Sequence, residues 1–191
     1  MKRTIIIIIL ICVAVGLGYV YEITSSIIEK RTYPLLYEDF VEKYSTEYNV
    51  PREIVYSIIK TESSFRSNAE SHRGAIGLMQ ITPDTFDWLM TKTGEKLDRG
   101  MLYDPNTNIR YGTYFLRYLF REFEEYNDEA WNLAFAAYNA GLNRVKGDWM
   151  NNPEYIENGK ILYIPFEETR NYIEKVNKAI GIYRRLYFKD K

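Results

Sequence analysis

One glutamate stands where a helix is expected to bury apolar side chains. The segment PREIVYSIIKT begins with a proline and has the spacing of an amphipathic helix, with Ile54, Ile58 and Ile59 on one face. Glu62 follows Ile58 by four residues and Ile59 by three, so it continues this apolar face. Burial disfavours the charged form of a carboxyl group and raises its pKa. A carboxyl that keeps its proton near neutral pH is what general acid catalysis requires.

A second interpretation of Glu62 is structural, because a glutamate at the edge of the apolar face can simply pair with Arg66 or Arg73. The loop that follows, GAIGLMQ, carries two glycines, which let backbone approach other backbone or a ligand closely. Its last residue, Gln80, brings a donor and an acceptor into a segment that otherwise has a buried character. Taken alone, this segment also fits a tight structural loop.

Four separated blocks of the sequence occur in the order of a known family. They are Glu62-Ser63; Gly77-Leu78-Met79-Gln80; Ala137-Tyr138-Asn139-Ala140-Gly141; and Pro165-Phe166 with Glu168-Thr169-Arg170 and Tyr172. With this set the chain resembles the catalytic domain of the soluble lytic transglycosylases, the lysozyme-like SLT domain of glycoside hydrolase family 23. Asp104-Pro105, Asn108-Ile109 and Gly112 also fit the family pattern, whereas Leu142 stands where the family often has proline. The resemblance implies a single lysozyme-like domain that is helical throughout.

The resemblance also implies an activity, which is cleavage of the β-1,4 bond between N-acetylmuramic acid and N-acetylglucosamine in peptidoglycan. Glu62 would first protonate the leaving oxygen and then act as a base on the muramoyl O6 hydroxyl, which closes a 1,6-anhydro ring without water. Two alternatives remain open, a muramidase that hydrolyses the same bond and a non-catalytic peptidoglycan-binding scaffold. Retention of Glu62 with the rest of the motif set argues against the scaffold.

Most glycosidases use two carboxylates, which raises the question of a partner for Glu62. Asp84 and Asp104 are explained by helix starts, where a carboxylate complements the helix dipole. Two further acidic residues, Asp87 and Glu95, lie in polar surroundings without a partner pattern, as does Asp98 nearby. The family is understood to work without the second carboxylate, with the N-acetyl group of the substrate supporting the cationic centre.

Smaller roles follow from the resemblance for other motif residues. The residues expected to line the glycan groove are Ser63, Met79, Gln80, Tyr138, Asn139, Glu168 and Tyr172. The residue types alone leave structural roles open: Met79, Tyr138 and Tyr172 also suit the core. Asn139 and Glu168 also suit helix ends.

The N-terminus differs in kind from the rest of the chain. After Lys2 and Arg3, the run IIIIILICVAVGLGYVY carries no charge and is near the lower limit of about 17 residues for a membrane span. Its flanking charges predict an uncleaved anchor at residues 1–21 followed by a polar tether at 22–33. A cleaved signal peptide, which would give a secreted protein, is the alternative. Either interpretation sends the rest of the chain out of the cytoplasm.

Composition sets the remaining limits. With a net charge of −1 the chain has no electrostatic character for binding nucleic acid. A single cysteine, Cys12, and a single histidine, His72, exclude an internal disulfide and argue against a Cys/His metal site. We expect His72 to be an exposed loop residue, no cofactor, and a monomer that acts on glycan strands. The domain is predicted at residues 34–191, with helices near 35–48, 51–65, 82–94, 104–126, 128–141 and 165–188 and a brief extension near 159–166.

Overall fold

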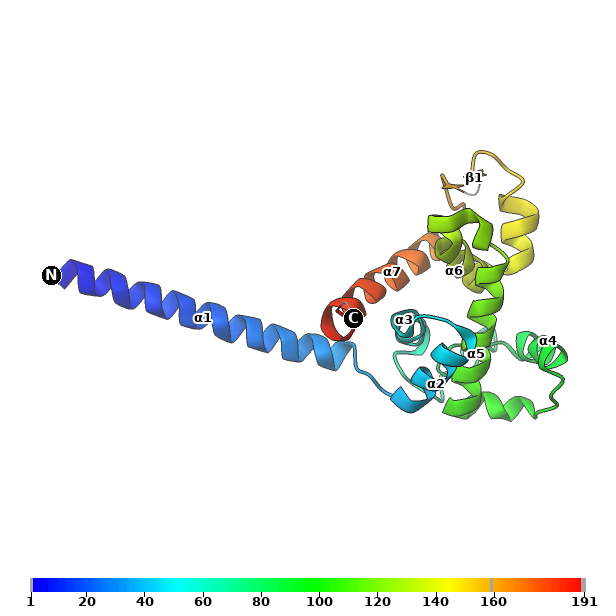
Figure 1. The fold of residues 1–191 in the computed structure, drawn as a ribbon, viewed down its shortest axis with the longest axis horizontal. Helices are drawn as coiled ribbons and strands as arrows, with labels where there is room; N and C mark the ends of the chain where they lie inside the picture. Colours follow the sequence, from blue (N-terminus) through cyan, green and yellow to red (C-terminus); the bar gives the residue numbers. More distant parts are fainter. Residues whose placement is uncertain (1, 159, 190–191) are drawn as a thin grey trace. The chain divides into compact units, whose positions relative to one another are not determined.

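The chain forms two compact units that divide between Pro34 and Leu35 (Figure 1). The computed structural model describes residues 2–158 and 160–189, and for residues 2–11 it describes the backbone alone. The elements in chain order are α1 (Lys2–Thr32), α2 (Glu38–Tyr48), α3 (Arg52–Ser63), α4 (Pro83–Thr93), η1 (Arg99–Tyr103), α5 (Pro105–Arg121), η2 (Glu124–Glu129), α6 (Ala130–Ala140), η3 (Arg144–Trp149), β1 (Ile156–Glu157), β2 (Lys160–Ile161) and α7 (Glu167–Tyr187).

The first unit consists of α1, which is longer than the sequence suggested. Residues 22–32 were expected to form a polar tether, but they continue the helix. The small polar side chains there do not interrupt it, because they bond back to the preceding turn. The Thr24 hydroxyl, for example, donates to the carbonyl of Val20 at 2.8 Å.

Within the described part of the chain, no helix combines the length and apolar content needed to traverse a bilayer. Residues 1–11 of the expected anchor lie outside the residues whose side chains are described. From Val13 to Ile28, many large apolar side chains of α1 are exposed.

The second unit is built around α5, which packs against α2 and α6. Helix α7 contacts both α3 and α6, so it joins the end of the chain to a helix that lies more than a hundred residues earlier. Figure 1 shows α5 (green) as the long helix between α2 and α6. The ends of α3, α6 and α7 carry three of the four motif blocks, so the packing of α7 decides whether these blocks meet.

Two helices begin close to the predicted positions, each at a capping side chain. The Thr82 side chain accepts a hydrogen bond from the Thr85 amide ahead of α4, and Gly94 ends that helix with a positive φ of 75°. Asp104 caps α5 by accepting from the Thr107 amide at 2.8 Å. These contacts satisfy backbone groups that a helix end would otherwise leave unpaired.

The domain is mostly helical but not purely so. Strands β1 and β2 pair in antiparallel fashion, with Ile156 opposite Ile161. The weak extension expected near residues 159–166 is therefore one arm of a short hairpin. Isolated bridges also join Ile76 to Glu70 and to Ile81, which gives the glycine loop after α3 an extended shape.

The apolar face of α3 is buried as predicted, with Ile54, Ile58 and Ile59 at most 2% exposed. Burying an isoleucine side chain fully contributes about 1.5–3 kcal/mol, so this face fixes the rotation of α3 about its axis. On α7, Tyr172 is buried in the interior and its neighbour Ile173 is only half-buried.

One buried side chain holds the glycine loop in place. The Oδ1 atom of Asn108 on α5 accepts from the Met79 amide at 2.8 Å. Its Nδ2 donates to the carbonyls of Ile76 at 3.0 Å and Leu102 at 2.7 Å. Because Asn108 is only 1% exposed, these bonds replace water for three backbone groups at once.

Two glycines make this arrangement sterically possible. Gly77 has a φ of +81°, and a Cβ atom added there would lie 2.4 Å from the carbonyl oxygen of Leu102. A Cβ added at Gly112 on α5 would lie 2.4 Å from the sulfur of Met79. The prediction that the loop glycines permit close approach is confirmed at Gly77, where the approaching groups are the Asn108 side chain and the Leu102 carbonyl.

Candidate active site

Glu62 lies in the last turn of α3, where it is half-buried. Burial raises the pKa of its carboxyl from the ordinary 4.5 to about 7. The Tyr172 hydroxyl donates to its Oε1 at 2.7 Å and offsets part of that rise, since a hydrogen bond to the charged form lowers the pKa. Near neutral pH this carboxyl can therefore either give or take a proton.

The groups nearest to this carboxyl are neutral. Burial, and next the charge of Glu62, raises the pKa of Tyr172 well above its ordinary value. Burial likewise raises the pKa of Tyr138, and the charge of Glu62 adds to the rise. Both phenols therefore keep their protons at physiological pH. Within the described residues, no cation contributes to the pKa of Glu62.

The arginines that could have paired with Glu62 have other partners. Arg66 donates from Nε to the carbonyl of Ser63 at 3.0 Å. Arg73 forms an exposed ion pair with Glu168 at 3.8 Å. The interpretation of Glu62 as half of a surface ion pair is therefore wrong. Burial raises the pKa of its carboxyl, and neither arginine offsets that rise.

Hydrogen bonds between neighbouring segments hold the site together. Ser63, beside the catalytic candidate, donates from Oγ to the carbonyl of Leu78 at 2.8 Å and so joins α3 to the glycine loop. Tyr138 at the end of α6 donates its hydroxyl to the carbonyl of Met79 at 2.6 Å. The loop is thus fixed from α3 and from α6, in addition to α5.

Helix α7 completes the connection. Buried Thr169 donates from Oγ1 to Oδ1 of Asn139 at 2.7 Å, which links α7 to α6. One turn further along, Tyr172 reaches Glu62 on α3. The four sequence blocks therefore converge on one carboxyl group.

Two predicted groove residues do not present their side chains to a ligand. Met79 is 0% exposed because its side chain packs against Gly112, and only its backbone reaches the site. Ser63 is 1% exposed and its hydroxyl is bound to backbone. Both residues lie in the core, so they shape the site through the fold.

The remaining predicted residues are accessible to different degrees. Gln80 is half-buried, and its Nε2 donates to the carbonyls of Ala69 at 3.1 Å and Gly77 at 2.9 Å, which supports the loop. Tyr138 and Asn139 are also half-buried. Glu168 is exposed in the first turn of α7, while Tyr172 is 7% exposed. His72 is exposed, as predicted.

The acidic residues that could have served as a second carboxylate have roles of their own. Asp104 caps α5, and Asp98 caps η1 by accepting from the Gly100 amide at 2.8 Å. The remaining pairs are Asp84 and Asp87 with Arg99, and Glu95 with Arg110. None of these five is among the groups that contribute to the pKa of Glu62.

Sequence reasoning gave no role to two residues that support the site. Asn108 and Thr169 entered only as family-pattern positions, yet one fixes the loop and the other joins α7 to α6. A polar residue beside Ile109 on the buried face of α5 was an available signal for Asn108. Thr169 offered no such signal, because its partner lies thirty residues away in sequence.

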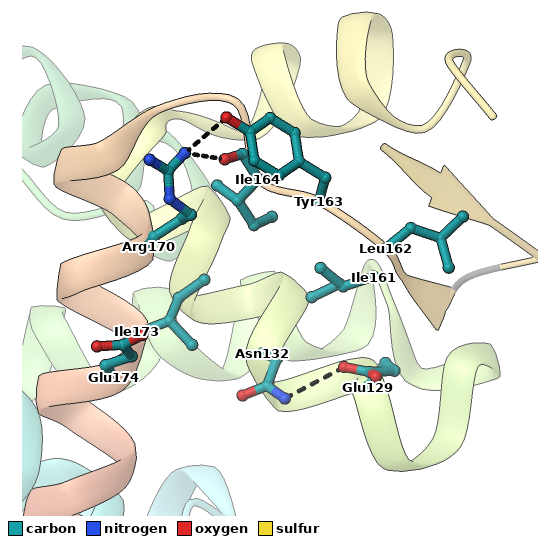
Figure 2. Close-up of a pocket in the computed structure, with 9 residues that line it drawn as sticks. All are labelled: Glu129, Asn132, Ile161, Leu162, Tyr163, Ile164, Arg170, Ile173 and Glu174. Carbon is teal, nitrogen blue, oxygen red and sulfur yellow. Dashed lines mark hydrogen bonds between the residues drawn. The ribbon is translucent and has the colours of Figure 1, made fainter. Parts of the chain in front are cut away.

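A separate pocket lies beneath the hairpin and contains none of the predicted site residues (Figure 2). This hairpin pocket has a volume of about 350 Å³ and is lined by residues of β2, α6 and α7 and the segment between β2 and α7. At its edge Arg170 donates from Nη1 to the Tyr163 hydroxyl at 3.2 Å and to the carbonyl of Ile164 at 2.6 Å. Its arginine is therefore already bound to protein groups.

Comparison with known proteins is consistent with this geometry. The transglycosylase SLT domain family matches residues 39–159. The soluble lytic murein transglycosylase of Escherichia coli (strain K12) is 34% identical over 173 residues, covering 86% of this chain and 25% of that protein. Membrane-bound lytic murein transglycosylase C of Actinobacillus succinogenes is 33% identical over 170 residues, covering 78% of this chain and 47% of that protein. The chain thus spans a quarter to a half of these relatives.

Solved structures agree. The crystal structure of the 70 kDa soluble lytic transglycosylase from Escherichia coli has a TM-score of 0.75 and 32% identity, covering 85% of this chain and 26% of that one. An inactive glutamate-to-glutamine mutant of lytic transglycosylase Slt from Pseudomonas aeruginosa has a TM-score of 0.71 and 29% identity, covering 83% and 25%. The family resemblance and the mostly helical lysozyme-like fold are confirmed.

The raised pKa of Glu62 predicts a specific dependence of stability on pH. Since its pKa is 4.5 before folding and about 7 after, the ionised form opposes folding. This cost is absent below pH 4.5 and reaches about 3 kcal/mol above pH 7. Glu62→Gln should therefore unfold at a temperature higher by roughly 6–12 °C at pH 8, with no gain at pH 4.

Thermal unfolding followed by circular dichroism across this pH range measures the difference. Glu154→Gln provides a matched control, since Glu154 is an exposed loop residue. If wild type and Glu62→Gln unfold at the same temperature at pH 8, the pKa of Glu62 is not raised by folding and its carboxyl is hydrated.

Proposed function

Because the chain belongs to the transglycosylase SLT domain family, we propose that it cleaves peptidoglycan as a lytic transglycosylase with Glu62 as its acid and base. One observation carries the assignment to Glu62: a half-buried carboxyl with a pKa of about 7 accepts a hydrogen bond from a neutral tyrosine. The relatives named lytic murein transglycosylases support the reaction, and an inactive glutamate-to-glutamine mutant among the similar structures supports the use of a glutamate.

In the first step Glu62 gives its proton to the glycosidic oxygen between N-acetylmuramic acid and N-acetylglucosamine. The bond from C1 of the muramoyl sugar to that oxygen breaks, and positive charge develops at C1. The N-acetyl group of the substrate supports this charge, since Asp87, Glu95 and Asp104 are bound to other groups of the protein. Substrate assistance is a recognised exception to the two-carboxylate scheme.

In the second step the Glu62 carboxylate takes the proton of the muramoyl C6 hydroxyl, and the oxygen attacks C1. A 1,6-anhydro ring forms, water is not consumed, and Glu62 regains its starting protonation state. The Tyr172 hydroxyl stabilises the carboxylate between the two steps, because it donates to the charged form at 2.7 Å. A pKa near neutrality suits a group that must act in both directions.

The glycan strand would contact the accessible atoms around the carboxyl. Tyr138 and Asn139 at the end of α6 are half-buried, and Glu168 at the start of α7 is exposed, so all three can reach a ligand. The amide of Gln80 is bound to backbone carbonyls and leaves its Oε1 atom for a sugar hydroxyl. Ser63 and Met79 would act through the loop alone.

Mass spectrometry of digested peptidoglycan sacculi tests the reaction. We expect the domain from Pro34 onward to release muropeptides with anhydro ends, which are one water lighter than reducing ends. Glu62→Gln should lower the release by a factor of at least about 10³, because general acid and base catalysis are lost together. The Glu154→Gln control should remain active.

Mainly reducing-end products would assign the chain to the hydrolytic muramidases. Binding to sacculi without any release would assign it to the non-catalytic scaffolds. Full activity in Glu62→Gln would remove the catalytic role of that residue.

The pH profile tests the contact between Tyr172 and Glu62. The phenol lowers the pKa of the carboxyl, so Tyr172→Phe should raise that pKa further. The acid is active while protonated, and the alkaline limb of kcat/KM should therefore move to higher pH in the variant. Tyr163→Phe is a suitable control, since it removes a hydroxyl that contacts a different face of α7. If the alkaline limb of kcat/KM stays at the same pH in Tyr172→Phe, the hydrogen bond from Tyr172 does not set the pKa of Glu62.

We also propose that α1 attaches the domain to the outer face of the cytoplasmic membrane. The uncharged run after Arg3, the exposed apolar side chains of α1 and the similarity to membrane-bound relatives support this proposal. In membranes washed at high pH the full chain should stay in the pellet. Val15→Lys with Leu17→Lys should release it, whereas Val15→Leu with Leu17→Ile should not. A shortened protein found in the medium would favour a cleaved signal peptide.

A further inference from the structure

Two side-chain hydrogen bonds join α7 to α6, the helices that lie beside each other in Figure 1. The Thr169 hydroxyl donates to Oδ1 of Asn139 at 2.7 Å, and farther along α7 the Asn177 amide donates to Oδ1 of Asn132 at 2.9 Å. They differ in their surroundings, since Thr169 is 1% exposed whereas Asn177 is exposed. Water can replace the second bond easily, but it cannot reach the Thr169 hydroxyl.

The Thr169 hydroxyl is directed away from its own helix. Helical threonines commonly bond back to a carbonyl of the preceding turn, as Thr24, Thr32 and Thr93 do. Thr169 is the third residue of α7, so no complete turn of that helix precedes it. Its hydroxyl is therefore free to bond across to α6.

The Asn139 side chain takes no part in ending its own helix. Helix α6 ends at Gly141, whose amide donates to the carbonyl of Ala137 at 2.8 Å. The hydrogen bond recorded for the Asn139 side chain is the one with Thr169. A motif asparagine that is not needed as a cap is thus held by a buried hydroxyl of another helix.

This hydrogen bond decides which end of the Asn139 carboxamide is left over. A carboxamide can turn over about its terminal torsion, which has a broad, roughly two-fold preference. Turned over, it would bring its NH₂ group to the Thr169 proton, which needs an acceptor and binds no other group of the described residues. The observed orientation therefore leaves Nδ2 as the unused end.

The unused Nδ2 atom is accessible. Among the described residues no group accepts a hydrogen bond from it, and it is not one of the buried polar atoms that lack a partner. The Asn139 side chain is half-buried, so one part is fixed inside and another reaches the surface. What Asn139 offers to a ligand is an N–H donor.

Asn139 lies next to the catalytic carboxyl. Thr169 and Tyr172 are three residues apart on α7 and so lie on one face of that helix, and Tyr172 donates to Glu62. Burial first, and the charge of Glu62 next, raise the pKa of Tyr138, the residue before Asn139. A substrate whose reacting oxygen meets Glu62 is therefore within reach of Asn139.

We propose that Thr169 is a positioning residue for the glycan strand. Its hydroxyl holds the Asn139 carboxamide so that Nδ2, and not Oδ1, meets an acceptor oxygen of the strand cleaved at Glu62. This inference rests on the proposed function and assigns a role to a residue that has no access to the substrate. A donor that is already oriented loses less freedom when the strand binds, and it holds the reacting bond in register with Glu62.

The test compares Thr169→Val, which keeps the shape and removes the hydroxyl, with Thr169→Ser, which keeps the hydroxyl. The substrate is soluble glycan strands from which an amidase has removed the peptide stems. We expect Thr169→Val to lower kcat/KM for anhydro-product formation roughly three- to tenfold, the value of one hydrogen bond. Thr169→Ser should stay near wild type.

Asn177→Ala is the matched control, because it removes the other polar contact between α7 and α6. It should leave kcat/KM near the wild-type value. Equal losses in Asn177→Ala and Thr169→Val would assign the effect to helix packing and overturn the proposal. Equal losses in Thr169→Ser and Thr169→Val would also overturn it, because the methyl group and not the hydroxyl would then matter.

A double-mutant cycle shows whether Thr169 acts through Asn139. In an Asn139→Ala background, Thr169→Val should cause no further loss, because the group that it positions is gone. The full three- to tenfold loss in that background would overturn the proposal. If Thr169→Val fails to fold by circular dichroism, Thr169→Ala takes its place in both comparisons.

The pH profile separates positioning from a general displacement of α7. Tyr172 lies one turn beyond Thr169, and its bond to Glu62 is not altered by the substitution. The alkaline limb of kcat/KM should therefore stay at the wild-type pH in Thr169→Val. A limb that moves as in Tyr172→Phe would trace the loss to Tyr172 and overturn the proposal.

Binding without turnover separates this inference from the proposed function. In a Glu62→Gln background, Thr169→Val should weaken the binding of the same peptide-free strands roughly three- to tenfold by titration calorimetry. If this loss is seen while the wild-type protein forms no anhydro product, the reaction alone is contradicted. If anhydro products form at the wild-type rate in Thr169→Val, the role of Thr169 alone is contradicted.

Discussion

The withdrawal of one carboxyl group from water, without a cation to replace the water, is the constraint on which the rest of the site depends. An arginine or lysine beside Glu62 would lower its pKa and leave it ionised at neutral pH. Arg66 and Arg73 are close in sequence, but they bind a backbone carbonyl and Glu168 instead. The carboxyl of Glu62 instead accepts a hydrogen bond from the hydroxyl of Tyr172. This neutral donor stabilises the ionised form less than a cation would, so the protonated form stays accessible near neutral pH.

Keeping that environment dry and fixed requires support from the core. Asn108 holds three backbone groups of the loop and its neighbourhood, and the glycines at 77 and 112 let the chain approach closely enough for those bonds to form. The carbonyl of Met79, positioned in this way, receives the hydroxyl of Tyr138. Residues without access to a ligand therefore set the positions of the ones that have it, as is usual where a site must be preorganised.

A lone acid shapes the proposed chemistry as well. Because Asp87 and Glu95 are bound to arginines and Asp104 to a helix start, the proposed reaction takes its stabilising and attacking groups from the substrate. Intramolecular attack demands that the muramoyl ring be held in one orientation. Contacts along the strand, away from the reacting bond, are a physical means of holding it.

The sequence by itself predicted most of the helices and indicated Glu62 as the candidate acid. Spacing of Ile54, Ile58 and Ile59 set the buried face of α3, and the caps at Thr82 and Asp104 set two helix starts, because these are local properties of neighbouring residues. Tertiary structure decided the environment of the acid. Glu62 is bound by a tyrosine from α7 and not by a nearby arginine, and Ser63 and Met79 are buried. These features, like the roles of Asn108 and Thr169, depend on contacts between segments far apart in sequence. Such contacts arise only when helices pack, and periodicity along one helix carries no information about them.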